Sequence, residues 1–409
     1  MSDVLIGYVI KIALLTEHYL PQVGGAEVFT YNIAKYLRQA GHLVDVYLPV
    51  EKYEALDENY RNLLIPLPRK FFGAVNRIPI LGAIRARRYL LKTQRQESYD
   101  GWLVVATYPA GYVGRYLKEF VPTVLRASGQ DIQKSSELNY GLRLNSSVEA
   151  KIRQTVRAYS KVVAMTESSR SEFQELGAND DAIIAIPNGV DLERFALRGD
   201  IEQIREELGW PNNTNVILTT GRNHPKKGFN LIPLVAERLR AQGFKFRWYV
   251  VGRRVHELNK EVRSRSLGKF VITCDEIGPD FEVTENWGFP ANKLVAMYQA
   301  ADIYAFPTLL ENYPMVLPEA MAAGTAIVTT DAPGARDVIK HGVNGLQARS
   351  GDIDDFTRQL GSVLGDSRLR NSLSRGAREF AQGLSWHNVA KKYEQVFREL
   401  MDVHEDNSQ

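Results

Sequence analysis

Short apolar runs alternate along the chain with longer segments whose apolar residues recur at helical spacing. In the first half of the chain each run is followed by a loop or helix signal. This alternation is typical of parallel sheets flanked by helices. It predicts strands at 11–16, 43–49, 101–106, 122–126 and 161–165, with a helix at about 27–39 that stops at Gly41.

A second series of the same kind begins after residues 186–191, where Pro187 and Asn188-Gly189 carry turn chemistry. Its predicted strands are 216–220, 247–251, 303–306 and 326–329. We therefore expect an α/β chain with two Rossmann-like, doubly wound domains, 1–190 and 191–385, which face each other across a cleft. The helical stretch 386–401 could cap either domain; we expect residues 386–409 to rejoin the first.

Length and composition agree with two folded domains. The 409 residues exceed what one hydrophobic core usually serves, and 44% are hydrophobic. A single cysteine, Cys274, excludes an intramolecular disulfide and a Cys-x-x-Cys pair, so a cytoplasmic location is expected. The apolar run 4–15 could suggest a signal peptide, but Asp3 precedes it where a signal peptide is basic, and Lys11 interrupts the run. We therefore interpret residues 11–16 as a buried strand.

The net charge of +3 argues against a general nucleic-acid binder, but the charge is unevenly spread. Residues 61–95 contain nine Lys and Arg and no Asp or Glu, interleaved with apolar residues. This mixture suits the surface of an anionic bilayer, although a solvated face on a helix at 83–94 would give the same pattern. The residues expected on an acceptor or membrane side are Arg85, Arg87, Arg88 and Lys92.

Gly24 and Gly25 follow the first strand and open the first helix. Glycine lets a ligand approach the backbone, and helix N-terminal amides favour an anion, although a plain tight turn explains the pair equally well.

After the strand 216–220, Arg222 and Lys227 lie five residues apart on a loop. Arg222 can grip two phosphate oxygens while Lys227 acts as a point charge; a solvated basic loop is the alternative.

Two glutamates follow the strand 303–306. Pro314 suits the first position of a helix, which would place Glu319 about one and a half turns inside an apolar run. A buried carboxylate needs hydrogen-bond donors, and ribose hydroxyls would supply them. A structural carboxylate bonded to protein would also explain Glu319.

These motifs, in this order, resemble the retaining glycosyltransferases of family 4 (glycosyl transferases group 1), which have the GT-B fold. The resemblance rests on Gly24-Gly25, residues 186–191, Arg222 with Lys227-Gly228, Glu311-x7-Glu319 and residues 342–345. It implies that Arg222 and Lys227 hold a donor diphosphate, Glu319 the ribose, and that Glu311 faces the transferred sugar. Gly24, Gly25, Tyr313, Met315 and Val316 would also line the donor site, and Gly288 and Phe289 would border the base.

Two residues depart from the family pattern. Ser128, in Ser128-Gly129-Gln130-Asp131, stands where many members carry a histidine near the reacting sugar, and a serine cannot carry a positive charge. Pro314 has no amide to offer a phosphate or sugar. We include Ser128 with Glu311, Arg222 and Lys227 among the catalytic candidates, because the mechanism ascribed to this family needs no protein nucleophile.

The resemblance implies transfer, with retention, of a hexose or N-acetylhexosamine from a nucleotide-diphosphate sugar, with UDP favoured over GDP. The expected acceptor is lipid-linked, a glycan or otherwise anionic, in cell-envelope or polysaccharide biosynthesis, and the protein would be cytoplasmic or peripheral on the inner membrane face. No metal cofactor is expected. A sugar-nucleotide epimerase of the same architecture and a degenerate member that only binds nucleotide sugar are the alternatives.

Overall fold

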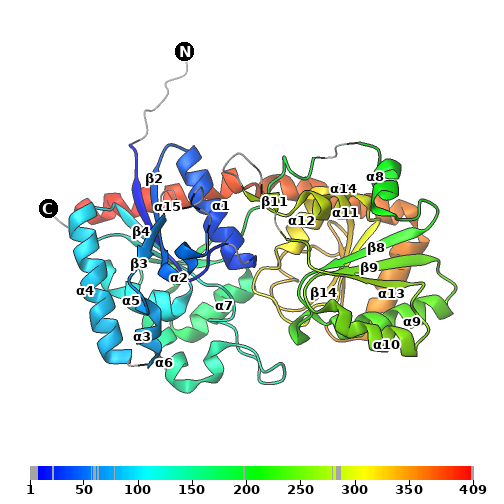
Figure 1. Ribbon diagram of the computed structural model, residues 1–409, viewed down its shortest axis with the longest axis horizontal. Coiled ribbons are helices and arrows are strands. Elements are labelled where there is room, and N and C mark those ends of the chain that lie inside the picture. Colours follow the sequence, from blue (N-terminus) through cyan, green and yellow to red (C-terminus); the bar gives the residue numbers. More distant parts are fainter. Residues whose placement is uncertain are drawn as a thin grey trace, which may run out of the picture. The chain divides into compact units, whose positions relative to one another are not determined.

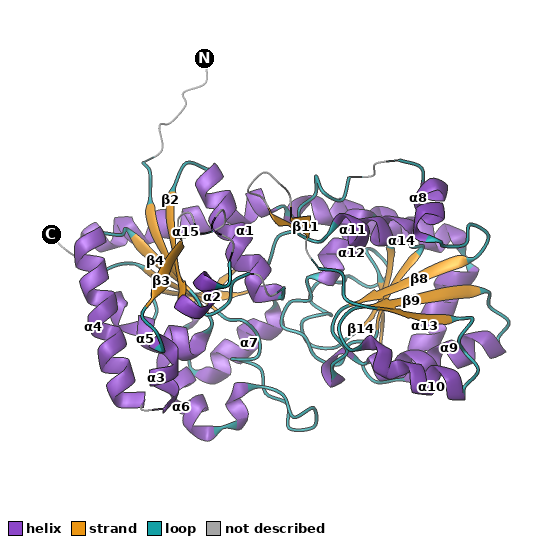
Figure 2. Cartoon of the chain, viewed as in Figure 1, coloured by secondary structure: helices purple, strands orange, loops and turns teal. Residues whose placement is uncertain are grey.

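The computed structural model describes residues 8–20, 23–56, 58, 61, 64–77, 79–196, 199–278, 280–281 and 287–406. The chain divides into two compact units, Met1–Pro187 with Trp386–Gln409, and Asn188–Ser385 (Figure 1). Each unit is built around a parallel sheet with helices on its faces (Figure 2). The predicted fold class, an α/β chain with two Rossmann-like domains, is confirmed.

The first unit contains a parallel sheet in the order β3-β2-β1-β4-β5-β6-β7. The central strands are buried along their whole length, as expected for a parallel sheet covered on both faces. The strand order reverses between β1 and β4. The strands are β1 (Lys11–Leu15), β2 (Leu43–Pro49), β3 (Leu64–Leu67), β4 (Gly101–Val105), β5 (Thr123–Arg126), β6 (Lys161–Ala164) and β7 (Ile183–Ala185).

The helices of the first unit include the last one of the chain. Phe29 of α1 packs its ring 6.2 Å from Trp386 and 5.7 Å from Tyr393 of α15, measured between centroids, so α15 belongs to this unit. The helices are α1 (Gly25–Gln39), α2 (Val50–Glu54), α3 (Phe71–Arg77), α4 (Pro79–Glu97), α5 (Tyr112–Gly114), α6 (Ser146–Val156), α7 (Glu167–Leu176) and α15 (Trp386–Asp406).

The second unit repeats the arrangement with the strand order β10-β9-β8-β13-β14-β15, also parallel. Here the order reverses between β8 and β13. A two-stranded antiparallel sheet, β11 (Asp280–Phe281) with β12 (Trp287–Gly288), lies outside it. The main strands are β8 (Asn215–Thr220), β9 (Phe246–Val251), β10 (Val271–Cys274), β13 (Ile303–Phe306), β14 (Ala326–Thr330) and β15 (Leu346–Ala348).

The helices of the second unit flank this sheet (Figure 2). Their capping follows ordinary rules: Asp200 caps α8, and Asp366 caps α14 through the amides of Arg368 and Leu369. The helices are α8 (Ile201–Leu208), α9 (Ile232–Ala241), α10 (Asn259–Ser264), α11 (Asn292–Ala300), α12 (Val316–Ala323), α13 (Ile353–Gly365) and α14 (Ser367–Ala381).

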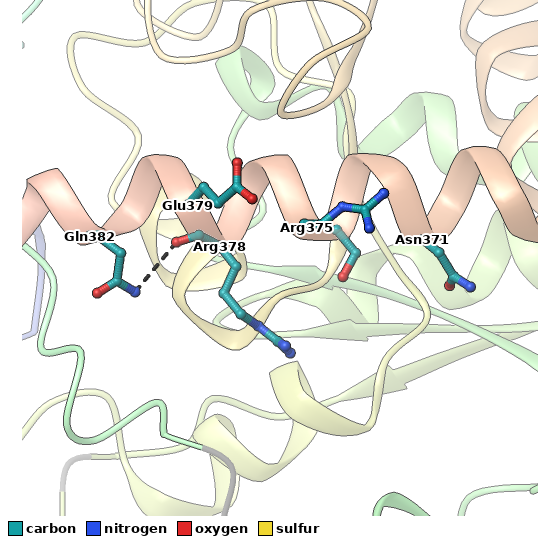
Figure 3. A pocket seen from close by; sticks show the side chains of 6 residues that line it. Asn371, Arg375, Arg378, Glu379 and Gln382 are labelled. Atoms are coloured by element: carbon teal, nitrogen blue, oxygen red, sulfur yellow. Dashed lines mark hydrogen bonds between the residues drawn. The ribbon is translucent and has the colours of Figure 1, made fainter.

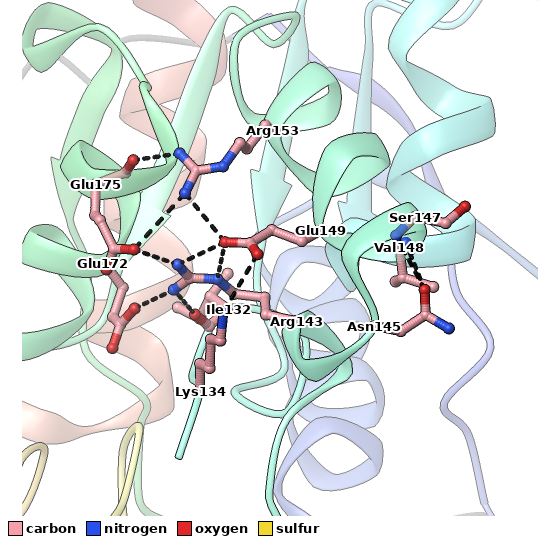
Figure 4. A network of polar contacts seen from close by, with 10 residues as sticks. All are labelled: Ile132, Lys134, Arg143, Asn145, Ser147, Val148, Glu149, Arg153, Glu172 and Glu175. Carbon is pink, nitrogen blue, oxygen red and sulfur yellow. Dashed lines mark hydrogen bonds and ion pairs between the residues drawn. The ribbon is translucent and has the colours of Figure 1, made fainter. Parts of the chain in front are cut away.

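A buried ion network holds the segment after β5 to two helices of the first unit (Figure 4). The side chain of Arg143 is 1% exposed, and its guanidinium contacts Glu149 of α6 at 3.1 Å and Glu172 of α7 at 2.5 Å. Glu175 lies 2.5 Å away, and Arg143 also donates to the carbonyl of Ile132 at 2.7 Å. Arg143 therefore contacts three carboxylates, of which Glu149 and Glu175 also contact Arg153, and the network ties the segment that carries Arg143 to α6 and α7.

Candidate active site

The loop after β8 is bound to the segment after β13, at the point where the second sheet reverses its strand order. In parallel sheets of this kind, ligands bind at such a switch point, outside the carboxyl ends of the strands. The carbonyl of Lys226 accepts bonds from the Leu309 amide at 2.7 Å and the Thr308 hydroxyl at 3.0 Å. Gly228 has φ +65°, and a Cβ there would lie 1.9 Å from the Pro307 carbonyl oxygen, so the close approach requires glycine.

Glu311 lies between two lysines at this switch point. Its carboxylate contacts Lys227 Nζ at 2.5 Å and Lys226 Nζ at 3.2 Å. Glu311 is only 4% exposed. Burial alone would raise its pKa, but the two lysines outweigh burial and lower the pKa below its ordinary value. Glu311 is therefore held as a carboxylate beside the residues predicted to bind phosphate.

Arg222 is exposed on the same loop, and in the described part of the chain no ion pair or hydrogen bond engages its guanidinium. The charge of Arg222 acts on the neighbouring His224. The pKa of His224 is lowered by burial and by four nearby cations, namely Arg222, Lys226, Lys227 and Arg254. Burial likewise lowers the pKa of Lys227. The loop therefore carries more positive charge than Glu311 balances, which suits an anionic ligand.

Glu319 lies closer to the start of its helix than the sequence predicted. The helix α12 begins at Val316, with Met315 before it, so the expected helical start at Pro314 is wrong. The reason lies in the backbone bonds: the Pro314 carbonyl accepts from the Leu317 amide at 3.0 Å, a tight turn, and the Met315 carbonyl is the first to accept at helical spacing, from the Glu319 amide at 3.2 Å. Glu319 consequently lies in the first turn. Two side chains of this segment contact Asn188: the Tyr313 hydroxyl donates to its carbonyl at 3.2 Å, and the Met315 sulfur lies 3.1 Å from its Nδ2.

The Glu319 carboxyl has a protein partner, as the structural alternative required. It accepts a bond of 2.8 Å from the Tyr298 hydroxyl, which lies 2.7 Å from the Thr220 hydroxyl at the end of β8. Burial raises the pKa of Glu319 to about 7, and the Tyr298 bond offsets this only in part. One donor leaves the second carboxyl oxygen able to accept from a ligand hydroxyl.

The other predicted donor-side residues occupy mixed positions. Tyr313 is buried and Met315 half-buried, and both contact Asn188 as described; Val316 is the half-buried first residue of α12. Gly288 lies in β12, and Phe289 directly after it is buried. Their contacts with a nucleotide sugar stay predictions.

In the first unit, Gly24, Gly25 and Ser128 lie at the carboxyl edge of the sheet. Gly24 is the residue before α1 and Gly25 its first residue. The Ser128 hydroxyl donates to Asp131 at 3.1 Å, and Asp131 also accepts from the amides of Ser128 and Gly129, both at 2.9 Å. Ser128 therefore has its proton engaged within the protein, while its oxygen can still accept a bond.

The basic segment 61–95 includes α4, and one face of this helix carries an exposed stripe. The stripe contains three of the four residues that were predicted on an acceptor or membrane side. Leu81 is 65% and Ile84 44% exposed, and Arg85, Arg88 and Lys92 are exposed at helical spacing beside them. Arg87 differs, because its guanidinium lies 4.8 Å from the Tyr116 ring centre. Several apolar residues that were expected to interleave with these charges lie in the core instead. They are Leu64, Phe71, Phe72, Val75 and Leu90. Leu63, Ile78 and the side chain of Ile80 lie outside the described residues.

Sequence reasoning missed two groups at these edges. Lys226 was overlooked because the Pro-Lys-Lys run does not indicate that both lysines turn to one carboxylate. His18 and Glu17 follow β1, and nothing in the local pattern marks them; the contact of His18 with Glu27 appears only when the chain folds.

A hollow on α14 is lined by polar side chains: Asn371, Ser374, Arg375, Arg378, Glu379 and Gln382 (Figure 3). Two of these bind the end of α12, since Arg378 donates to the Ala323 carbonyl at 3.2 Å and Ser374 to that of Gly324. The hollow is therefore explained by helix capping.

Within the described residues, no helix is both long and apolar enough to cross a membrane. The same residues contain no group of three or more His, Cys, Asp or Glu side chains arranged to hold a metal ion. Metal independence remains an expectation.

Comparison with known proteins assigns both units. The family model described as glycosyl transferases group 1 matches residues 200–380, and the model described as glycosyltransferase family 4 matches residues 23–194. A D-inositol 3-phosphate glycosyltransferase from Corynebacterium aurimucosum is 25% identical over 423 residues, which covers 96% of this chain and 97% of that protein.

Solved structures agree on the fold. Sucrose-phosphate synthase from Thermosynechococcus elongatus superposes with a TM-score of 0.76 at 17% identity, covering 96% of this chain and 100% of that one. Anabaena HepE in complex with UDP-glucose superposes with a TM-score of 0.73 at 19% identity, again covering 96% and 100%. The two-domain architecture is therefore that of the GT-B glycosyltransferases.

Proposed function

The chain belongs to the glycosyltransferases of family 4, group 1, and from this premise we propose that it transfers a hexose or an N-acetylhexosamine from a UDP-sugar with retention of configuration. The observation that carries this proposal is the charge arrangement at the switch point of the second sheet. Exposed Arg222 and the Lys226–Glu311–Lys227 group lie there together. UDP is preferred over GDP because the similar Anabaena HepE was solved with UDP-glucose.

In the proposed donor complex, Arg222 and Lys227 bind the diphosphate and Glu319 accepts from the ribose hydroxyls. Glu311 faces the transferred sugar, and Gly288 and Phe289 border the base. As the sugar–phosphate bond breaks, negative charge grows on the diphosphate, and fixed positive groups stabilise that charge most effectively when they are already in place. The lysines are already oriented by Glu311, so little reorganisation is needed.

We propose that the acceptor is anionic: a lipid-linked molecule, a glycan or a phosphorylated polyol. Two observations support this. The curated relative is named for D-inositol 3-phosphate, which is an anionic polyol. In addition, the exposed stripe on α4 presents Arg85, Arg88 and Lys92 next to Leu81 and Ile84, a combination suited to peripheral binding at an anionic cytoplasmic membrane face.

The experiment that tests this function has two parts. A thermal-shift screen of nucleoside diphosphates and their sugars identifies the donor, since a ligand that binds only the folded state raises the melting temperature. Products are then analysed with the donor alone and with an acceptor panel that includes D-inositol 3-phosphate. Transfer to an acceptor supports the proposal; an isomerised sugar nucleotide from donor alone indicates an epimerase; tight binding without transfer or hydrolysis indicates a non-catalytic member.

A further inference from the structure

His18 lies at the carboxyl edge of the first sheet, where its strand order reverses. It follows β1 directly, and the loop after β5 with Asp131 is close enough to influence its ring electrostatically. The Asp131 carboxylate also accepts a bond of 2.5 Å from the Thr107 amide after β4. His18 thus lies after the end of β1 and within electrostatic reach of the loop after β5, at the edge of the sheet where ligands of such sheets bind.

The imidazole of His18 is held in one orientation. The ring Nδ1 lies 3.2 Å from Glu27 Oε1. The backbone amide of His18 donates to the Thr16 hydroxyl at 2.8 Å. Glu27 folds back at the start of α1, where a Cβ on Gly24 would lie 2.6 Å from its Oε2. Glycine at position 24 therefore leaves the space that Glu27 needs to reach the ring.

This orientation determines which ring nitrogen is available. A carboxylate at Nδ1 favours the tautomer that carries its proton there, so Nε2 of the neutral ring is a hydrogen-bond acceptor. The side chain is 34% exposed, and among the described residues no contact to Nε2 is found. A fixed, partly open acceptor atom matches a ligand hydroxyl.

Charged groups on several elements face this pair. Glu17 precedes His18, Glu27 lies on α1 and Asp131 after β5, and together they raise the pKa of His18 although burial opposes them. Arg126 at the end of β5 and Lys52 of α2 also interact electrostatically with Glu27. The positive charge of Arg126 also reaches Asp131, so the carboxylates are not left without counter-charge.

We propose that His18, oriented by Glu27, binds a hydroxyl group of the sugar or polyol acceptor through Nε2 and so helps to set acceptor specificity. This inference rests on the proposed transferase function and adds to it a residue of the first unit. No proton transfer is assigned to His18. The neutral ring accepts the bond, and protonation turns Nε2 into a donor, so a hydroxyl that is oriented to donate to it loses its acceptor.

The first test needs no substrate. In ¹⁵N-histidine-labelled protein above the His18 pKa, the ring is expected as the Nδ1–H tautomer, and its pKa is expected to fall in Glu27→Gln because the partner that raises it is gone. The Nε2–H tautomer, or a pKa unchanged in Glu27→Gln, overturns the proposal whether or not the acceptor is known.

The second test uses His18→Asn, whose amide can still donate to Glu27 but has no atom in place of Nε2. With the best acceptor of the panel, kcat/KM is expected to fall about tenfold, as for loss of one hydrogen bond, while the UDP-induced thermal shift is retained. At saturating donor, where weaker donor binding on protonation of Glu319 does not limit the rate, the acid limb of the acceptor kcat/KM profile should vanish in this variant and move to lower pH in Glu27→Gln. His387→Asn, an exposed position on α15, is the matched control.

The outcomes separate the two proposals. Normal transfer by His18→Asn, with an unaltered pH profile, contradicts a substrate-binding role and leaves the transferase intact. If wild-type protein glycosylates no acceptor in the panel, the proposed function fails, and the tautomer measurement still decides how His18 is arranged.

Discussion

Lys227 Nζ lies 2.5 Å from Glu311 Oε1, a contact that joins the loop after β8 to the segment after β13. The two residues are 84 positions apart, and the sequence assigned them to different tasks, phosphate binding and contact with the sugar. Their pairing indicates that the two tasks share one electrostatic unit. A ligand phosphate near Lys227 therefore competes with Glu311 for the same ammonium group.

Replacement of Arg222 or Lys227 by alanine should weaken UDP-sugar binding and slow transfer. Each change removes a charge-assisted contact worth roughly 1.5–3 kcal/mol, or about tenfold to a hundredfold in kcat/KM. Only Lys227→Ala should also lower the melting temperature, because it removes a partner of buried Glu311 whereas Arg222 is exposed. Steady-state kinetics and thermal unfolding check both points; unchanged kinetics in both variants would exclude the phosphate assignment.

The two glutamates should differ in their kinetic effects. Glu319→Ala should mainly raise the donor KM, because its role is to bind the ribose, while Glu311→Ala should mainly depress kcat if it faces the reacting sugar. Glu311→Gln is the better-matched variant, since it keeps the volume beside Lys226 and Lys227. Equal changes of both parameters in both variants would contradict this division of roles.

Glu319 should make donor binding depend on pH near neutrality. Its pKa is raised by burial to about 7, and the carboxylate form is the better acceptor for ribose hydroxyls, so affinity should increase as pH rises through 7. The same group should affect stability in the opposite direction. The pKa of Glu319 in the folded state lies above its unfolded value of 4.5, so between these two pKa values the folded state binds more protons than the unfolded state. The free energy of unfolding therefore falls as pH rises from about 4.5 to about 7.

Glu319→Gln separates these effects. The variant should lose the part of the pH dependence of UDP affinity that comes from Glu319, and should gain melting temperature relative to wild type at about pH 8, with no gain at about pH 4. Glu17, whose pKa is also raised to about 7 by burial, remains in both proteins and cancels in the comparison. A melting-temperature difference that does not change with pH would refute the raised pKa.

Loss of Arg143 should destabilise the first unit strongly. Arg143→Leu removes the shared partner of Glu149 and Glu172 (Figure 4). Breaking a buried ion pair costs about 3–5 kcal/mol, and we expect the lower end of this range because Glu149 keeps Arg153 at 3.0 Å. Lys134→Ala, whose side chain is 42% exposed and also contacts Glu149, should change stability by less than about 1 kcal/mol. Denaturant unfolding measures both, and similar values for the two variants would contradict the network's role.

The stripe on α4 should bind anionic vesicles. Co-sedimentation with anionic lipid at low salt should be reduced by replacing Arg85, Arg88 and Lys92 with glutamine, by on the order of 1 kcal/mol per residue, and should fade at high salt. Arg87→Gln should have a smaller effect than any of these three, because Arg87, although exposed, lies off the stripe with its guanidinium 4.8 Å from the Tyr116 ring centre. If wild-type protein stays in the supernatant at low salt, a soluble acceptor becomes the better proposal.

The apolar pattern located the central strands well, because these are buried on both faces. The predicted run 303–306 is β13 to the residue, and 216–220 differs from β8 by one residue. The strands it missed lie at sheet edges: β3, which contains Pro66, β7, β10 and β15 are short or only partly buried. Edge strands have no continuous apolar run because one side faces solvent or a loop.

The candidate site was only partly predictable. Arg222 and Lys227 were predicted from the basic loop after a strand, and Glu311 and Glu319 from the segment after 303–306 and the family resemblance; their roles stay predictions. The contacts of Lys226 and His18 depend on residues far along the chain, Glu311 and the helix start at Glu27, and no local pattern encodes such distances. The same holds for Tyr298, which binds Glu319 from a different helix.

A crystal structure of the protein with UDP would show which residues bind the diphosphate. We expect the diphosphate within hydrogen-bonding distance of Arg222 and Lys227, with the ribose hydroxyls on Glu319 and the Lys227–Glu311 contact lengthened or shared. Density for UDP at another place in the second unit, or a nucleotide whose phosphates contact neither Arg222 nor Lys227, would contradict this expectation.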